Sequence, residues 1–157
     1  MDINEIHRPD FDSIPEVKFH RKATLIRVVD GDTLDVEIDL GWSLKIKERL
    51  RLELVDTPEI KSKTENQAGK LVKSIVQKWL GENPPLIITS VAYDRTGKVR
   101  GKYGRTLAHV FHAEEKWSLN RRLLQEKLAW ATNEKGDIIG ERDLSLLTGL
   151  NDVQTNP

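Results

Sequence analysis

The fold is decided by residues 23–54, which read ATLIRVVDGDTLDVEIDLGWSLKIKERLRLEL. Over most of this stretch apolar residues alternate with charged ones, and a period of two places successive side chains on opposite faces of a strand. Asp30-Gly31 is a typical turn dipeptide, and Gly41 closes the second alternating run. The stretch predicts three consecutive strands in a meander: Ala23 to Val29, Thr33 to Leu40, and a third run from Leu44 to Leu54.

The hydrophobic period then changes to three and four residues, which predicts an α-helix. The apolar positions that carry this period are Ala68, Leu71, Val72, Ile75, Val76 and Trp79. Thr64 and Gln67 have the spacing of a capping box at the start of this helix. Gly81, followed by Pro84-Pro85, marks its end.

The rest of the chain predicts two more strands, Leu86 to Tyr93 and Thr106 to His112. Ser118 can cap a second helix that turns its leucines inward, and Glu141 to Leu147 predicts a short third helix. This order matches a five-stranded OB-fold Greek-key barrel with a helix between strands three and four. We therefore expect a mainly β protein with helices (α+β), including one or two C-terminal helices.

Composition sets the outer limits of this expectation. The chain has 157 residues and a mass of 18.0 kDa, which suits one domain. We expect a loosely ordered leader at residues 1–20, a single domain of this barrel type at 21–150 and a tail at 151–157. The sequence has no cysteine, so a metal would be held by oxygen or imidazole ligands. Its 25 basic and 25 acidic residues balance, so net charge does not point to a nucleic-acid partner.

Location is left open by the sequence. Apolar runs fall short of the roughly 18 residues that a membrane span needs, so no membrane partner is expected. The acidic N-terminal stretch, which carries Pro9 and Pro15, is unlike a signal peptide. As written, the chain is expected to be cytoplasmic; it would be secreted if a signal segment had been removed before residue 1.

Three short segments concentrate residues that suit chemistry: Asp30-Gly31-Asp32-Thr33, Arg51 to Glu59, and Lys102-Tyr103-Gly104-Arg105. The second segment ends a strand in Asp56-Thr57-Pro58-Glu59, where proline bars further strand pairing just as two carboxylates occur. Taken alone, it is also explained as a turn with solvated acids. The third belongs to residues 98–105, which contain four cations and no acid.

Together the three segments resemble the motifs D-G-D-T, R-x-x-x-V-D-T-P-E and K-Y-G-R of the staphylococcal nuclease (thermonuclease) family, in the same order. The resemblance runs from about Ala23 to about Ala131. It implies that Asp32 and Asp56 are carboxylate ligands of a calcium ion, with the backbone carbonyl of Thr57 as a further ligand.

The resemblance also implies roles for the other matched positions. Glu59 aligns or deprotonates the attacking water, and Arg51 with Arg105 binds the phosphate that is cleaved. Lys102 and Tyr103 match positions that contact a terminal phosphate.

The implied activity is calcium-dependent hydrolysis of DNA and RNA, with single-stranded or denatured substrates preferred. Cleavage on the 5′-oxygen side leaves 3′-phosphate ends, and a monomer is expected. Two alternatives remain: a nuclease-like module that binds nucleic acid or a protein without cutting, and a structural protein whose acids only confer solubility.

The sequence also departs from the staphylococcal enzyme around the expected cleft. The hairpin between Asp32 and Arg51 is longer, and the loop between Glu59 and the first helix is shorter. After the second helix, Ala131-Thr132-Asn133-Glu134 stands in place of tyrosines on which a base can stack. Trp130 could take over that stacking or could belong to the core.

Overall fold

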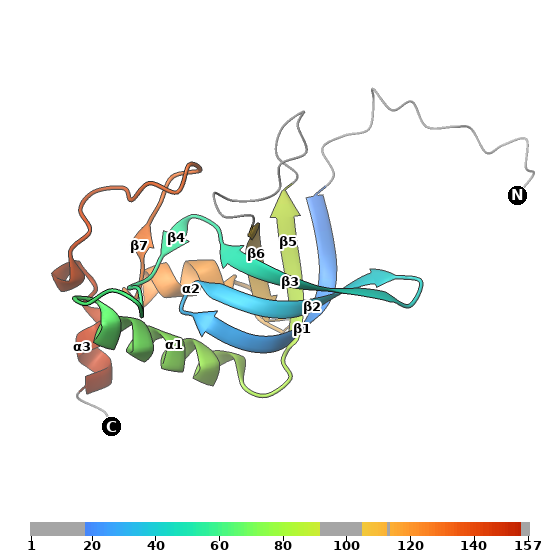
Figure 1. Cartoon of the computed structure of the whole chain (residues 1–157), viewed down its shortest axis with the longest axis horizontal. Coiled ribbons are helices and arrows are strands. Elements are labelled where there is room, and N and C mark those ends of the chain that lie inside the picture. Colours follow the sequence, from blue (N-terminus) through green and yellow to red (C-terminus); the bar gives the residue numbers. More distant parts are fainter. Residues whose placement is uncertain (1–17, 92–104, 113, 155–157) are drawn as a thin grey trace, which may run out of the picture.

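Five strands close into a barrel in the order β1-β2-β3-β6-β5 in this computed structural model, which describes residues 18–91, 105–112 and 114–154. The strands are β1 (Lys18–Asp30), β2 (Thr33–Gly41), β3 (Leu44–Leu52), β5 (Pro85–Val91) and β6 (Thr106–His112). The helix α1 (Asn66–Leu80) lies between β3 and β5 in the sequence. The predicted OB-type α+β barrel is therefore confirmed (Figure 1).

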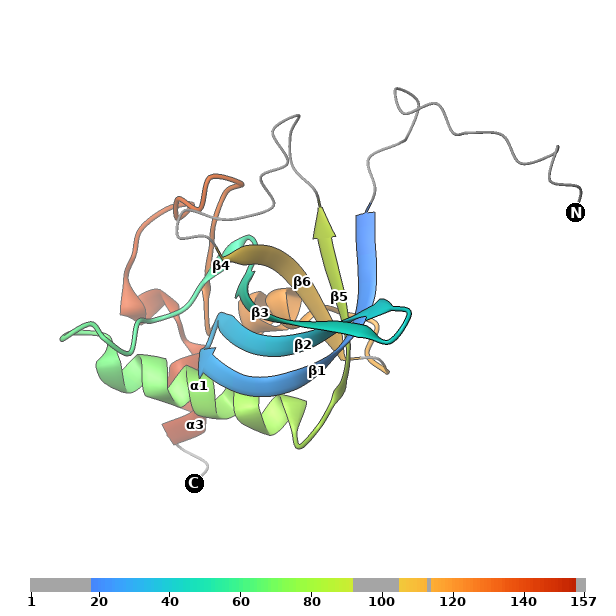
Figure 2. The same cartoon turned by 45° about the vertical axis from the view of Figure 1, so that its right-hand side comes forward.

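Alternation of apolar side chains fills the inside of the barrel. Leu34 on β2 lies opposite Leu50 on β3, and both are completely buried. The parallel pairing of β3 with β6, which begins at Leu50 and Thr106, closes the barrel. Helix α1 runs along the outside of β1, as Figure 2 shows, and it buries Val72 and Val76.

A small second sheet, which the sequence did not predict, follows the barrel strand β3. Strand β3 ends at Leu52. The second sheet consists of β4 (Val55–Asp56), which pairs antiparallel with β7 (Trp130–Ala131). The prediction that Leu54 continues the third strand is wrong. Its φ is +63° and its side chain is 37% exposed, because the chain turns there to leave the barrel.

The far end of the β2–β3 hairpin extends beyond the barrel (Figure 2). Leu44 and Ile46, on the alternating face of the third run, are 58% and 40% exposed, and Trp42 at the tip is 95% exposed. Because Leu44 and Ile46 continue the apolar alternation of the third run, the pattern alone favours a buried face at these two positions. The side chains stay exposed because no second layer of the described part of the chain packs against this arm.

The ends of the helices agree only in part with the prediction. The prediction of a capping box formed by Thr64 and Gln67 is wrong. The N-cap residue of α1 is Glu65, and its side chain makes no cap hydrogen bond. Instead, the Ser62 hydroxyl accepts hydrogen bonds from the backbone N–H groups of Thr64 and Glu65, each at 3.3 Å. Ser118 does cap α2 (Leu119–Gln125), where its hydroxyl accepts from the backbone of Arg121.

The C-terminal part differs from the predicted helix at residues 141–147. A short 3-10 helix, η3 (Leu144–Leu146), is followed by α3 (Gly149–Gln154). Residue 143 cannot belong to a helix that starts at Glu141, because its backbone is extended and its carboxylate caps η3. Strand β1 begins before residue 21 and α3 continues past residue 150, so regular structure crosses both expected domain limits. Within the described residues, no helix is long and apolar enough to span a membrane.

Candidate active site

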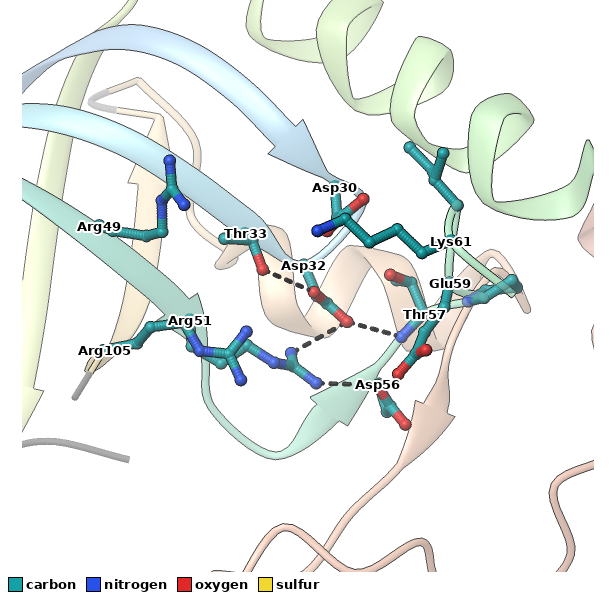
Figure 3. A pocket seen from close by; sticks show the side chains of 12 residues that line it. Asp30, Asp32, Thr33, Arg49, Arg51, Asp56, Thr57, Glu59, Lys61 and Arg105 are labelled. Carbon is teal, nitrogen blue, oxygen red and sulfur yellow. Dashed lines mark hydrogen bonds and ion pairs between the residues drawn. The ribbon is translucent and has the colours of Figure 1, made fainter. Parts of the chain in front are cut away.

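An open pocket with a volume of about 600 Å³ lies where the β1–β2 turn, the end of β3, β4 and the start of β6 meet. All six positions expected for metal and catalysis line it: Asp32, Arg51, Asp56, Thr57, Glu59 and Arg105. Figure 3 shows Arg51 and Arg105 pointing toward Asp32 and Asp56 from the strand side. Lys102 and Tyr103 lie outside the described residues.

Asp32 is held rigidly in the turn between β1 and β2. Its side chain is 8% exposed; one carboxylate oxygen accepts from the Thr33 hydroxyl at 2.9 Å, and the other accepts from the Thr57 N–H at 2.8 Å. Gly31 lets this turn pack closely against its neighbours, because a Cβ there would lie 2.6 Å from Cγ1 of Val72 on α1 and 3.0 Å from Oγ1 of Thr57. A larger residue at this position would therefore push the turn that carries Asp32 away from α1 and Thr57.

Arg51 joins the two aspartates that were predicted as metal ligands. Its guanidinium lies 3.0 Å from Oδ2 of Asp32 and 2.8 Å from Oδ1 of Asp56, and its side chain is 16% exposed. It also donates to the backbone carbonyl of Val55 at 2.9 Å. A planar guanidinium can satisfy all three acceptors at once because its N–H groups point in fixed directions. The geometry thus draws two carboxylates from distant elements to one point.

The loop that carries Glu59 packs directly against the first helix. A Cβ on Gly69 would lie 2.7 Å from the carbonyl oxygen of Pro58 and 2.8 Å from the backbone nitrogen of Ile60. The glycine in α1 therefore lets the helix touch the loop backbone. The side chain of Glu59 remains exposed at the pocket.

Two carboxyl groups that line the pocket have raised pKa values, so their charged forms are disfavoured there. The pKa of Asp56 is raised above its ordinary value, first by burial and then by the charge of Asp32, although Arg142 and Arg51 oppose the shift. The pKa of Asp30, which also lines the pocket, is raised by burial and again by Asp32. Carboxylates placed together in this way favour a bound cation, because a cation relieves their repulsion.

The oxygen donors suit a hard divalent cation. Two carboxylates and the adjacent backbone form the inner wall, and the buried Thr57 hydroxyl has no hydrogen-bond partner among the described residues. No group of three or more His, Cys, Asp or Glu gathers as a metal cage within residues 18–91, 105–112 and 114–154. Ca²⁺ would therefore need water in addition to Asp32, Asp56 and Thr57, which is common for this ion.

Sequence reasoning missed two further residues at this site, Arg142 and Glu65. Arg142 forms an ion pair with Oδ2 of Asp56 and pairs with Glu65 at 2.7 Å. This contact raises the pKa of Arg142 and lowers that of Glu65. Arg142 is 86 positions from Asp56 and lies within the segment predicted as a helix, so no local pattern pointed to the pocket.

Trp130 belongs to the core and is not a surface on which a base could stack. Its side chain is 5% exposed, and it lies in β7 directly opposite Asp56. Of the two roles left open for this tryptophan, packing is the one that the structure supports.

Comparison with known proteins is consistent with this site. A family model described as "Staphylococcal nuclease homologue" matches residues 49–147. The chain is 40% identical over 107 residues to a thermonuclease of Staphylococcus intermedius. The aligned region covers 67% of this chain and 56% of that relative. The chain is 37% identical over 109 residues to a thermonuclease of Staphylococcus hyicus, covering 68% and 57%. An uncharacterized protein of Bacillus anthracis is 33% identical over 114 residues, covering 71% and 46%.

The fold and the pocket define a small OB-type barrel with a site of carboxylates and arginines at its mouth. The matched family model covers more than half of the sequence, including Arg51, Asp56, Glu59 and Arg105. The chain belongs to the staphylococcal nuclease homologue family. It spans about half the length of the curated relatives that it matches.

Proposed function

We propose that this protein is a calcium-dependent nuclease that hydrolyses phosphodiester bonds of DNA and RNA. The observation that carries the proposal is the convergence of Asp32, Arg51, Asp56, Thr57, Glu59 and Arg105 on one open pocket. These residues come from four separate parts of the chain, and a turn with merely solvated acids would not bring them together. The relatives named thermonuclease support the same activity.

The reaction follows from the chemistry of these side chains. Glu59 is exposed in the pocket and takes a proton from the water that attacks phosphorus. The new P–O bond forms as the bond to the 5′-oxygen breaks. The leaving 5′-oxygen takes a proton from solvent water, Glu59 returns the proton it took to solvent, and a 3′-phosphate end remains. Arg51 and Arg105 bind the phosphate oxygens, where guanidinium groups stabilise the added negative charge of the transition state. Asp32, Asp56 and the Thr57 carbonyl would hold the calcium ion, which would supply further positive charge at the site of phosphate cleavage.

Single-stranded or denatured nucleic acid is the proposed substrate. The pocket is lined by Arg49, Arg51, Lys61 and Arg105, which suits a phosphate backbone. Among the described residues that line it there is no aromatic side chain, and Trp130 is buried, so this part of the pocket would bind phosphates and give no marked preference between DNA and RNA.

The test is digestion of denatured DNA and of RNA with calcium and with a chelator. We expect cleavage only with calcium, and products whose 3′ ends become extendable by a polymerase only after phosphatase treatment. A protein in which Asp32 is replaced by Asn serves as the negative control. Failure of the purified wild type to cut either substrate at any calcium concentration would rule out the enzyme.

A module that binds nucleic acid without cutting is the second candidate. It is favoured by the ion pairs of Arg51 and Arg142, which already neutralise Asp32 and Asp56. Thermal unfolding separates the two candidates. A nuclease should gain stability from calcium and gain more from calcium with a nucleoside bisphosphate, whereas a module without a metal site should gain nothing from calcium.

A further inference from the structure

A segment from the C-terminal part of the chain is anchored beside the pocket. The backbone N–H of Ile139 donates to the carbonyl of Ala131 at 2.9 Å, and the indole N–H of Trp130 donates to the carbonyl of Asp143 at 3.1 Å. Both anchor points belong to β7, whose partner strand β4 carries Asp56. The residues between these anchors are therefore held close to the active-site strand.

Arg142 lies in this anchored segment and pairs with Glu65 through two hydrogen bonds. Its Nε lies 2.7 Å from one carboxylate oxygen of Glu65, and a second guanidinium nitrogen lies 2.8 Å from the other. The Glu65 side chain is 12% exposed and that of Arg142 is 34% exposed. The guanidinium also lies over the Trp130 ring, 4.5 Å from its centre. A pair with two parallel bonds, a largely buried carboxylate and a stacked arginine is better fixed than an ordinary surface ion pair.

Glu65 also holds the backbone of Glu59, the proposed general base, in place. Its Oε2 accepts a hydrogen bond from the backbone N–H of Glu59 at 2.9 Å. The carbonyl of Glu59 accepts from the backbone of Ser62 at 3.2 Å, so the peptide groups on both sides of this residue are bonded. Since the Glu59 side chain is exposed, its backbone is what sets the direction from which the carboxylate enters the pocket.

We infer that Glu65, held by Arg142, is a positioning residue for Glu59. It touches neither the substrate nor the reacting atoms; it fixes the backbone from which Glu59 reaches the attacking water. The inference rests on the proposed function for its kinetic consequence, but the placement of Glu59 can be measured without catalysis. The Glu65 side chain does not cap α1, although it stands at the N-cap position. It bonds to Arg142 and to the Glu59 backbone instead.

The first experiment follows hydrogen exchange of the Glu59 backbone amide by NMR. We expect exchange at least tenfold faster in Glu65→Ala, because its acceptor is removed. In Glu65→Gln the slow exchange should be largely retained, since the amide oxygen can still accept this bond. Glu82→Ala, an exposed glutamate beyond the other end of α1, should leave the Glu59 amide unchanged. Equal exchange in the wild type and Glu65→Ala would overturn the inference.

The second experiment is a kinetic double-mutant cycle with Glu59→Gln. In the wild-type background, Glu65→Ala should lower kcat about tenfold with KM within twofold, and Glu65→Gln should restore most of kcat. In the Glu59→Gln background, Glu65→Ala should change kcat by less than twofold, because the group that it positions is already disabled. The same fold-loss in both backgrounds would mean that Glu65 acts independently of Glu59, and it would overturn the inference.

Arg142→Met gives the third arm, because methionine keeps an apolar chain near Trp130 but cannot pair with Glu65. We expect it to accelerate exchange of the Glu59 amide by a smaller factor than Glu65→Ala. A wild type without nuclease activity would contradict the proposed function alone, because the amide exchange reports the position of Glu59 in either case.

Discussion

Two aspartates in this protein are each held by two arginines, yet their pKa values move in opposite directions. Asp35 on β2 pairs with Arg27 and Arg49, both at 2.7 Å. Asp56 on β4 pairs with Arg51 and Arg142. The pKa of Asp35 is lowered to about 2, chiefly by the hydrogen bonds from Arg49, whereas the pKa of Asp56 is raised.

Accessibility of the carboxylates does not explain this difference, because the two side chains are 18% and 19% exposed. The surroundings do. The arginines around Asp35 are 63% and 46% exposed and face open solvent. Asp56 lies deeper among protein groups and close to Asp32, so burial and a second negative charge outweigh two arginines. The first cluster has the properties of a structural ion-pair network, whereas in the second the arginines do not fully offset burial and the neighbouring negative charge.

The largest expected difference between the clusters is in catalysis. Arg51→Lys should lower kcat/KM by about a thousandfold, roughly 4 kcal/mol, because lysine cannot make the paired bonds of a guanidinium to phosphate. Arg27→Lys makes the same replacement in the Asp35 cluster, away from the pocket, and should stay within twofold. Initial rates of cleavage of denatured DNA at saturating calcium measure both. Similar losses in the two variants would contradict the distinction.

Calcium should also tell the clusters apart, with an intermediate effect. At a calcium concentration of about a hundred times the dissociation constant, the folded protein should gain about 2.7 kcal/mol of stability. Asp56→Asn should abolish this gain and Asp35→Asn should keep it. Thermal unfolding with calcium, with magnesium and with chelator provides the measurement. A gain that survives Asp56→Asn would place the metal elsewhere.

The smallest expected effect is the dependence of stability on pH. The folded pKa of Asp35 lies below its ordinary value of 3.8, so its charged form stabilises the fold above that pH. Asp35→Asn should lower the free energy of unfolding at neutral pH by about 1 kcal/mol, a value reduced from the full shift because the arginines are exposed. This difference should shrink as the pH falls from about 4 through about 2.

Asp56 provides the matched comparison for that measurement. Because its folded pKa is raised, its contribution to stability is greatest below pH 3.8 and declines as the pH rises through the folded pKa. In metal-free protein, the stability difference between the wild type and Asp56→Asn should therefore change with pH in the opposite sense to that of Asp35→Asn. Denaturant unfolding between pH 2 and pH 6 tests this. Parallel profiles would show that the two aspartates have the same environment.

The predicted barrel and the observed one differ most where chain segments separate from the core. The strand patterns located β2 and β6 closely, and alternation put Leu34 and Leu50 on the apolar faces of their strands, where the structure buries both. The same alternation was misleading at Leu44 and Ile46, which are exposed on the hairpin arm. A period of two specifies which side chains share a face, but only the layer opposite that face decides whether it is buried.

The candidate site shows a similar division. Eight positions were expected from the three motifs. The six expected for metal and catalysis all line the pocket, Lys102 and Tyr103 lie outside the described residues, and the individual roles stay proposals. Glu65 was not foreseen, because an acidic residue before a helix is common on a protein surface. Arg142 was not foreseen either, because its partners are 77 and 86 positions away.

The sequence by itself determined the order of the strands and α1 along the chain and, through the three motifs that resemble the nuclease family, the positions expected at the site. The element order depends on local periods and the resemblance on short motifs, and both can be read from neighbouring residues. Only the tertiary structure decided that β4 pairs with β7 and that Arg142 reaches Asp56 and Glu65. The raised pKa of Asp56 was decided there too, because desolvation and the charge of Asp32 act through space and depend on the packed arrangement of distant segments.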